Sequence, residues 1–245
     1  IAASIASFFL LYRPRVVWNI RQSLYDIKTE KRRTAFLIKL GKLISFHPFK
    51  IIYNSQISKK QHETFGYSAD KSWTIPNGFD CDYFKPDIHS HLKLRKELNV
   101  TMNSKIVGMV ARFHPVKDHC NFFKAAKLIN EKDKKTHFVL AGIGVDDSNK
   151  YLISIIDQLG LNDCVHLLGE RRDIPYLMAG FDIFVLSSSF EGFPNVIGEA
   201  MASGVVCVST DVGDSSLIIQ NTGLVVFPND FSLLASAVLE LLKLK

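Results

Sequence analysis

Short runs of apolar, often β-branched residues alternate along this chain with longer segments in which apolar residues recur at helical spacing. Six such runs in the second half predict strands: 106–111, 137–141, 165–168, 182–186, 205–209 and 224–227. The segments between them predict helices: 118–131, 149–159, 173–180, 194–202 and 214–219. Because several strand runs are apolar at nearly every position, we expect an α/β domain whose Rossmann-like parallel sheet has helices on both faces.

The first part of the chain follows the same pattern. It predicts strands over 15–18, 50–53 and 73–75 and helices over 29–45 and 55–65. Residues 1–12 are apolar but too few for a membrane span, and they lack the basic start of a signal peptide, so we expect a buried helix. The chain starts with Ile1 in mid-pattern, which is typical of a fragment.

A break in the pattern divides the two parts. Pro76, Asn77 and Gly78 form a turn signal, and a mostly polar stretch with Pro86 follows. We therefore expect four segments: 1–80, the C-terminal part of an N-terminal α/β domain; 81–104, a linker; 105–230, a complete second domain; and 231–245, a truncated C-terminal helix.

Charge is unevenly distributed. Residues 1–60 hold 12 Lys or Arg and 2 Asp or Glu, a net of +10, and the remaining 185 hold 18 and 22, a net of −4, which together give the total of +6. The basic first quarter suits an acidic partner such as anionic lipid, nucleic acid or a phosphorylated substrate. A solvated basic helix around residues 28–42 explains it equally well.

The four cysteines are widely spaced and form no CxxC pair: Cys81, Cys120, Cys164 and Cys207. Each lies in or beside an apolar stretch, so we expect buried thiols in a reducing compartment and no zinc site.

The strongest chemical signal is the segment Glu191-Gly-Phe-Pro-Asn-Val-Ile-Gly-Glu199, which follows an apolar strand and a turn of three serines. Pro194 suits the first turn of a helix, and Gly204 suits its left-handed C-terminal cap. The predicted helix start at the carboxyl edge of a parallel sheet favours an anion. Glu191 and Glu199 beside it would accept hydrogen bonds from hydroxyls, so the segment fits a nucleotide sugar.

The second signal is Arg112-Phe-His-Pro-Val-Lys117-Asp118, between a predicted strand and a helix for which Asp118 is a good N-cap. Two cations in one strand-to-helix loop can converge on a diphosphate. The loop lies at the same predicted sheet edge as Glu191, which strengthens both interpretations.

Together these motifs resemble the group-1 retaining glycosyltransferases of the GT-B fold. The resemblance is carried in order and spacing by five segments and by the interdomain-like stretch Ile75–Asp80: Arg112–Lys117, Gly142–Gly144, Leu168–Arg171, Glu191–Glu199 and Asp211–Asp214. It implies a cytoplasmic enzyme that takes a sugar from a nucleotide-diphosphate donor, with retention and without a metal or other cofactor. It implies as acceptor a glycan or a lipid-linked saccharide. The basic first quarter adds the hypothesis that the first part of the chain contacts the cytoplasmic face of an anionic membrane, and we expect no nucleic-acid partner.

The resemblance also implies residue roles. Arg112 and Lys117 would hold the diphosphate and stabilise the leaving group, and Glu191 would hold the transferred sugar. Glu199 would bind ribose hydroxyls. The turn with Gly169 and Arg171 would receive the base, chiefly through backbone groups. The start of the predicted helix supplies the other substrate-binding positions: Gly192, Phe193, Pro194, Asn195 and Val196.

Several features fit other interpretations. The first part lacks the family's glycine-rich loop, and Arg21 stands where a His is frequent, so Arg21 either contacts an acceptor phosphate or is a surface cation. Asp80-Cys-Asp82 resembles a metal-binding Asp-x-Asp motif, although a turn role for Asp80 fits better. Gly142 and Gly144 lack the third glycine of a dinucleotide site. Two other functions stay open: a nucleotide-sugar epimerase of the same fold, and a non-catalytic nucleotide-sugar-binding protein.

Overall fold

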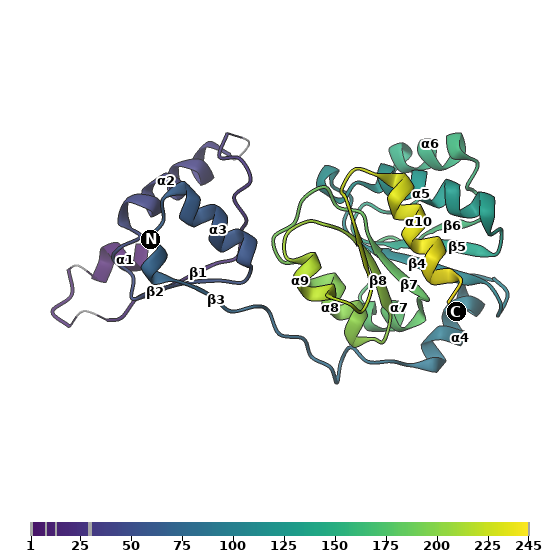
Figure 1. Ribbon diagram of the computed structural model, residues 1–245, viewed down its shortest axis with the longest axis horizontal. Helices are drawn as coiled ribbons and strands as arrows, with labels where there is room; N and C mark the ends of the chain where they lie inside the picture. The colour runs from purple at the N-terminus through teal and green to yellow at the C-terminus, as the bar shows by residue number, and fades with distance from the viewer. Residues whose placement is uncertain (1, 8, 13, 29–30, 245) are drawn as a thin grey trace. The chain divides into compact units, whose positions relative to one another are not determined.

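The computed structural model describes residues 2–7, 9–12, 14–28 and 31–244, which form two compact units: residues 1–77 (unit 1) and 78–245 (unit 2) (Figure 1). Both units are α/β, and the strands of each pair only in parallel. The expected fold class is therefore confirmed. Each unit is described by itself.

Unit 1 is built on a three-stranded sheet of order β1-β2-β3, formed by Val17–Ile20, Lys50–Tyr53 and Ser72–Thr74. Its helices are α1 (Ala2–Ser7), α2 (Arg32–Ile44) and α3 (Gln56–Phe65), with a 3-10 turn, η1 (Ala69–Lys71). Helix α3 begins where the Ser55 side chain accepts from the Ser58 N–H and ends at Gly66 with φ of 110°. The core holds Trp18, Ile51, Tyr53 and Tyr67.

The apolar start of the chain differs from the buried helix that its sequence predicts. Helix α1 ends at Ser7, and Phe9 and Tyr12, at the two ends of the apolar stretch that follows it, are 85% and 93% exposed. Within α1, Ser4 is buried, and its Oγ accepts from Trp18 Nε1 at 2.7 Å. Ile1 and Phe8 lie outside the described residues, as do Thr29 and Glu30 at the start of the predicted helix 29–45. No helix within the described ranges has the length and apolarity needed to cross a bilayer.

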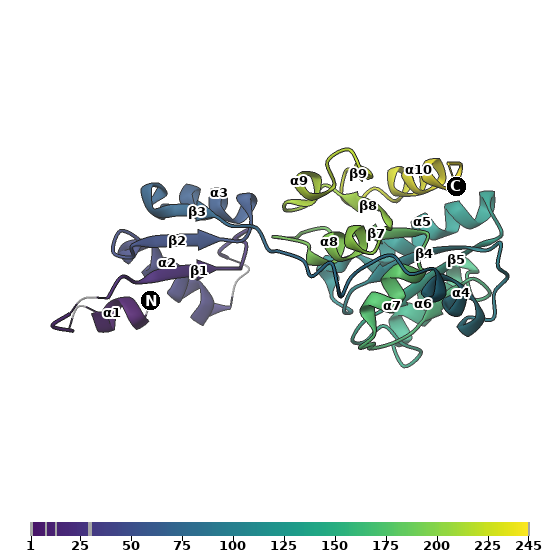
Figure 2. The ribbon, with the colours of Figure 1, turned by 90° about the horizontal axis from the view of Figure 1, so that it is seen from below.

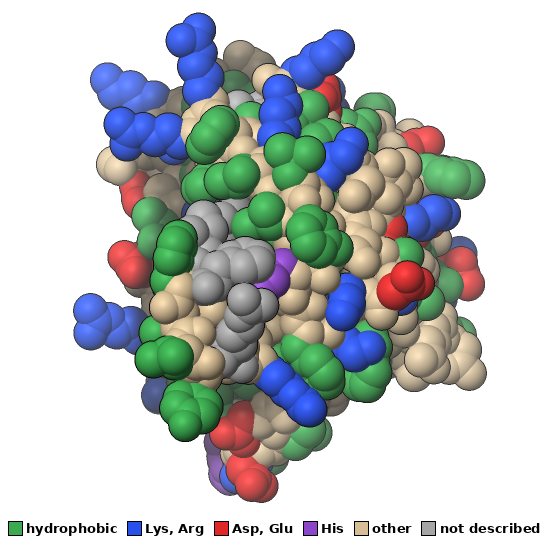
Figure 3. Space-filling view, turned by 90° about the vertical axis from the view of Figure 1, so that its left-hand side faces the viewer, with side chains coloured by type: hydrophobic (Ala, Val, Ile, Leu, Met, Phe, Trp, Pro, Cys, Tyr) green, Lys and Arg blue, Asp and Glu red, His purple; other side chains and the backbone are tan. Residues whose placement is uncertain are grey.

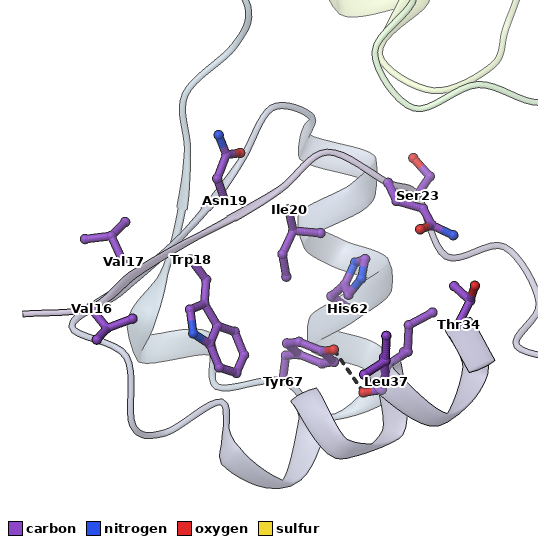
Figure 4. A pocket seen from close by; sticks show the side chains of 12 residues that line it. Val16, Val17, Trp18, Asn19, Ile20, Ser23, Thr34, Leu37, His62 and Tyr67 are labelled. Carbon is purple, nitrogen blue, oxygen red and sulfur yellow. Dashed lines mark hydrogen bonds between the residues drawn. The ribbon is translucent and has the colours of Figure 1, made fainter. Parts of the chain in front are cut away.

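A cavity of about 430 Å³ lies between β1 and the helices of unit 1 (Figure 4). Trp18 and Tyr67 line it together with His62 from α3 and Leu37 from α2. The Tyr67 hydroxyl donates to the Ile38 carbonyl at 2.9 Å, which ties the loop after α3 to α2. None of the residues that the sequence marks for chemistry lines this cavity.

Unit 2 contains a six-stranded sheet of order β6-β5-β4-β7-β8-β9 (Figure 2). Its strands lie within about two residues of the predicted runs: β4 (Lys105–Val110), β5 (Thr136–Ala141), β6 (Val165–Leu167), β7 (Ile183–Leu186), β8 (Val206–Thr210) and β9 (Leu224–Val226). Its helices are α4 (Ile88–Glu97), α5 (His119–Lys132), α6 (Lys150–Leu159), α7 (Ile174–Gly180), α8 (Asn195–Ala202), α9 (Ser215–Ile219) and α10 (Phe231–Leu242), with η2 (Pro115–Lys117) before α5.

Helices cover both faces of this sheet, as the apolar strands require. Helices α5, α6 and α10 bury Phe122, Leu152 and Leu234 against one face. Helices α4, α7 and α8 bury Leu94, Leu177 and Ile197 against the other. The loops at the ends of the strands are thereby held on a rigid base.

Helix α4 forms inside the segment that the sequence predicts as a linker. It packs on α7, with Leu94 fully buried. Arg95, 1% exposed, donates to Asp182 Oδ2 at 2.5 Å, and the same oxygen accepts from the Ile106 N–H at 2.7 Å. Helix α4 thus stands in a segment predicted as linker, because a buried leucine and a buried ion pair, among other contacts, fix an otherwise polar helix to unit 2.

Candidate functional site

The site lies where the strand order of unit 2 reverses. The chain runs outward from β4 through β5 to β6, then returns to β7 on the other side of β4. In open α/β sheets, the crevice beyond the carboxyl ends of two such strands is where ligands bind. Loops 111–118 and 187–194 leave β4 and β7 at this point, and they contain the two strongest sequence signals.

An ion pair joins the two loops. Lys117 Nζ lies 2.5 Å from Glu191 Oε1, and the two side chains are 20% and 15% exposed. The same carboxylate oxygen accepts from Ser188 Oγ at 2.8 Å. The residues predicted to hold a diphosphate and a sugar are thus in direct contact, 74 positions apart in the sequence.

The loop after β4 is fixed through its backbone. Its 3-10 turn η2 ends at Asp118, whose φ of 47° reverses the chain and whose side chain accepts from the Asn121 N–H. Ser187 Oγ is within hydrogen-bonding distance of the Lys117 and Asp118 carbonyls, at 2.9 and 3.1 Å. The backbone at Lys117 is therefore held from the end of β7, in addition to the ion pair of the Lys117 side chain.

A third loop, after β8, supports Glu191 from the other side. Thr210 Oγ1 donates to the Ser188 carbonyl at 2.6 Å, and the Asp214 N–H donates to the Gly192 carbonyl at 3.0 Å. Gly213 has φ of 56°, and a Cβ there would lie 2.2 Å from the Gly192 oxygen. Only glycine fits at this crossing, which explains the glycine in Asp211–Asp214.

Helix α8 presents its N-terminus to the same place. It starts at Asn195 after Pro194, and no side chain of the described residues caps it. Glu199 lies further along the helix, half-buried and with no hydrogen-bond donor in reach among the described residues; burial raises the pKa of its carboxyl. An uncapped helix start attracts an anion, and an unpartnered carboxylate next to it suits a hydroxyl.

Phe193 also has a defined partner within unit 2. Its ring stacks on that of Phe79, with centroids 6.3 Å apart. The Phe79 ring fills the space that a side chain at Gly198 would need, since a Cβ there would lie 2.1 Å from it. Phe79, at the start of unit 2, therefore packs against the turn between Glu191 and α8.

Arg112 and His119 lie at the two ends of the cationic loop. Arg112 is exposed and has no side-chain partner among the described residues. His119 is 3% exposed, and neither ring nitrogen finds a partner among the described residues. Burial, and next the charge of Lys117, lower the pKa of His119 to about 4, so its ring is neutral at pH 7.

The turns after β5 and β6 flank this loop on the other side. The Phe113 N–H donates to the Ile143 carbonyl at 2.8 Å, and the Gly142 N–H donates to the Gly169 carbonyl at 2.8 Å. Gly142 has φ of 154°, and a Cβ there would lie 2.1 Å from the Ala111 oxygen. Gly169 is therefore held beside the cationic loop.

Arg171 is bound in a network of its own. Its guanidinium contacts Asp173 at 2.7 and 2.8 Å and Glu97 of α4 at 2.7 Å, and Tyr176 donates to the same Glu97 carboxylate. These contacts hold the pKa of Glu97 below its usual range. The side chain thus fixes the turn to α4, and a base contact in this turn stays a prediction for its backbone.

The remaining candidate residues belong to other segments, and each is described by its own contacts. Arg21 Nη2 donates to Asn77 Oδ1 at 3.1 Å within unit 1. Asp80 accepts from the Asp82 and Tyr83 N–H groups, which confirms its turn role. No three His, Cys, Asp or Glu side chains group as metal ligands in the described parts of the chain. Cys164 and Cys207 are buried as expected. Cys120 is only partly buried, and Cys81 is exposed because it lies in a surface turn.

Four supporting residues were not identified from the sequence: Phe79, Ser188, Thr210 and Gly213. The serine turn and the Asp-Val-Gly-Asp segment were available signals for two of them, Ser188 and Gly213. Their partners lie in other loops, so only the folded arrangement reveals what they hold.

A family model described as "Glycosyl transferases group 1" matches residues 104–244, more than half of the chain. The chain belongs to the group 1 glycosyltransferase family. The resemblance drawn from the motifs is therefore confirmed, and GT-B glycosyltransferase structures are its structural neighbours.

Among curated group 1 relatives, the chain is 34% identical over 149 residues to the UDP-Gal:alpha-D-GlcNAc-diphosphoundecaprenol alpha-1,3-galactosyltransferase of Escherichia coli, covering 60% of this chain and 38% of that protein. It is 34% identical over 142 residues to the putative glycosyltransferase EpsF of Bacillus subtilis, covering 56% and 35%. The matches thus span less than two fifths of these relatives.

Among solved structures, HepE of Anabaena in complex with UDP superimposes with a TM-score of 0.86 at 28% identity, covering 98% of this chain and 65% of HepE. HepE in complex with UDP-glucose gives a TM-score of 0.84 with the same coverage.

Proposed function

We propose that the protein of which this chain is part transfers a sugar from a nucleoside-diphosphate donor to a glycan or a lipid-linked saccharide, and that unit 2 binds the donor. The observation that carries the proposal is the Lys117–Glu191 ion pair at the switch point between β4 and β7. It joins a cation for the phosphates to a carboxylate for the sugar hydroxyls in one crevice.

The site's charges supply the chemistry. As the donor bond breaks, negative charge grows on the departing diphosphate. Lys117 and Arg112, with the N-terminus of α8, would stabilise that charge by electrostatics fixed in advance by the loop contacts. When the Lys117 ammonium pairs with the diphosphate, it leaves Glu191 free to accept hydrogen bonds from the sugar hydroxyls. Glu199 then accepts hydrogen bonds from the ribose hydroxyls.

UDP-sugars are the first donors to test. HepE, at 28% identity, is described with UDP and with UDP-glucose, and the E. coli relative is named for a UDP-galactose donor. In our proposal the turn at Gly169 receives the base through its backbone, and the other substrate-binding positions are Gly192, Phe193, Pro194, Asn195 and Val196.

Retention of anomeric configuration and independence of metal are further parts of the proposal. Two cations and the N-terminus of α8 would neutralise the negative charge of the diphosphate, a role that a divalent cation has in metal-dependent enzymes. Proton NMR of the first-formed product would report the anomer. Full activity in excess EDTA is expected, and loss of activity that manganese restores would contradict metal independence.

The acceptor is proposed from a relative. The E. coli galactosyltransferase is named for a diphosphoundecaprenol-linked acceptor. A lipid-linked acceptor would bring the protein to the cytoplasmic face of the membrane as a peripheral protein, and the net charge of +10 over residues 1–60 suits an anionic surface.

Kinetics of the full-length protein test the proposal. Arg112→Ala and Lys117→Ala are each expected to lower kcat/KM at least tenfold, which is about 1.4 kcal/mol of transition-state stabilisation. Free nucleoside diphosphate should appear only when acceptor is present. Loss of less than tenfold would refute the assigned roles, and conversion of the donor into an epimeric nucleotide sugar without acceptor would favour the epimerase.

A further inference from the structure

The turn after β6 adjoins the cationic loop, and its glycine is used to hold it there. The Gly169 carbonyl accepts from the Gly142 N–H, and the Gly169 N–H donates to the Val145 carbonyl, both at 2.8 Å. The next N–H groups along the turn are those of Glu170 and Arg171, and neither has a hydrogen-bond partner among the described residues. A base received by the backbone of this turn therefore meets Glu170 and Arg171.

The Arg171 side chain determines where that backbone lies. Its Nε and Nη2 donate to the two carboxylate oxygens of Asp173 at 2.8 and 2.7 Å, and its Nη1 donates to Glu97 Oε1 at 2.7 Å. Several Lys and Arg side chains on the face shown in Figure 3 extend away from the surface. The Arg171 guanidinium, in contrast, is held through three nitrogens, and such two-point pairing with a carboxylate is strong and directional.

Glu97 connects this turn to an anchored part of α4. Leu94 is fully buried, and Arg95, two residues before Glu97, donates to Asp182 Oδ2 at 2.5 Å. The second oxygen of Glu97 accepts from the Tyr176 hydroxyl of α7 at 2.9 Å. Because both Glu97 oxygens are bound, the carboxylate has a defined position, and it relates the Arg171 guanidinium to two packed helices.

This network contributes more to the shape of the turn than to the stability of unit 2. The side chains of Arg171 and Glu97 are 23% and 34% exposed, and ion pairs at such exposure contribute little to folding. A backbone that is already fixed before the ligand arrives costs no ordering on binding, so the network would raise the affinity for a base. The Arg171 side chain itself is not available to the base, because its donors are bound within the chain.

We propose that Glu97 is a positioning residue for the nucleobase of the donor: acting through Arg171, it fixes the backbone of Glu170 and Arg171 against which the base binds. The inference rests on the proposed function, since it takes a nucleoside diphosphate as the ligand of unit 2. It adds that the affinity for the base is set from α4, separately from the affinity for the diphosphate at Lys117.

Isothermal titration of the chain with UDP, GDP, ADP and inorganic pyrophosphate tests the inference. Glu97→Gln and Arg171→Met are each expected to lower the affinity for the tightest-binding nucleoside diphosphate by about fivefold or more. The affinity for pyrophosphate should change by less than about twofold, because pyrophosphate meets the cations and not the turn. In the Arg171→Met background, Glu97→Gln should lower the nucleotide affinity no further, since Glu97 acts through Arg171.

The matched control is Glu131→Gln, which removes the exposed ion pair with Lys127 on α5 of the same unit and should leave all four affinities unchanged. Unchanged nucleotide affinity of Glu97→Gln and Arg171→Met would overturn the inference. An equal loss for the nucleotide and for pyrophosphate would also overturn it, because the network would then support the unit as a whole.

The unchanged chain separates this inference from the proposed function. If it binds pyrophosphate as tightly as every nucleoside diphosphate, the base gains nothing from the turn, and the inference fails while the diphosphate site stands. If it binds none of the four ligands, the proposed function itself is contradicted, and the inference falls with it.

Discussion

The Lys117–Glu191 contact can be tested in this chain by a double-mutant cycle with Lys117→Met and Glu191→Gln. Either single substitution leaves one charge in a crevice where the two side chains are only 20% and 15% exposed. Each should therefore destabilise unit 2, and the double variant should lose less than the sum of the two, because neither charge is then left unpaired.

The magnitude follows from the geometry. Two unit charges 2.5 Å apart attract by roughly 7 kcal/mol at an effective dielectric constant of about 20. Desolvation of two mostly buried groups offsets much of this, so we expect a coupling energy of about 1–2 kcal/mol. For a unit of this size, that corresponds to a change in Tm of roughly 2–8 °C.

Calorimetry would measure unfolding of unit 2, and tryptophan emission would report unit 1 separately, because Trp18 and Trp73 are the chain's two tryptophans. The same cycle on Lys127 and Glu131, an exposed pair 3.7 Å apart in α5, is the control and should give about 0.3–0.5 kcal/mol. Additive effects of Lys117→Met and Glu191→Gln would refute the ion pair as a feature of the crevice.

Three further changes have defined outcomes. Arg95→Met strands the buried Asp182 carboxylate and should cost about 3–5 kcal/mol of stability in denaturant unfolding; a loss below 1 kcal/mol would contradict the anchoring of α4. Gly213→Ala puts a Cβ against the Gly192 oxygen and should weaken nucleotide binding in calorimetry, whereas unchanged binding would show that the turn tolerates displacement. Because the pKa of His119 is lowered to about 4, its contribution to stability is present above pH 6.5 and is lost as the pH falls toward 4. His119→Phe should remove up to roughly 3 kcal/mol of that acid sensitivity; denaturant unfolding at pH 7 and pH 4.5 would check this, and equal pH dependence would contradict a neutral buried ring.

The fold of unit 2 was readable because its strands are buried on both faces. The apolar residues of β4, β5 and β7 are continuous, which differs from the spacing of apolar residues in an amphipathic helix. Helix α4 was not readable, since only Leu94 and Arg95 bury deeply and the partner of Arg95 is 87 positions away. A polar helix fixed by ion pairs to residues 74 and 87 positions away has no local signal.

The sequence predicted which loops form the site, but not which of their side chains contact each other. Sequence reasoning put Lys117 and Glu191 at one sheet edge, and they meet there. It did not foresee that they bind each other, because each was matched to a different part of a ligand. Nor did it foresee that Glu97 and Asp173 hold the Arg171 side chain, and a base contact through the backbone of this turn stays a prediction. Which of several possible partners a charged side chain takes depends on distances that only the folded chain defines.

Isothermal titration of this chain with UDP in the presence of EDTA tests the central claim most directly. We predict binding that Lys117→Met and Arg112→Met each weaken at least tenfold, about 1.4 kcal/mol, while the control Lys127→Met binds as the unchanged chain does. Equal affinities for all four proteins would contradict a crevice in which these two cations hold a nucleoside diphosphate.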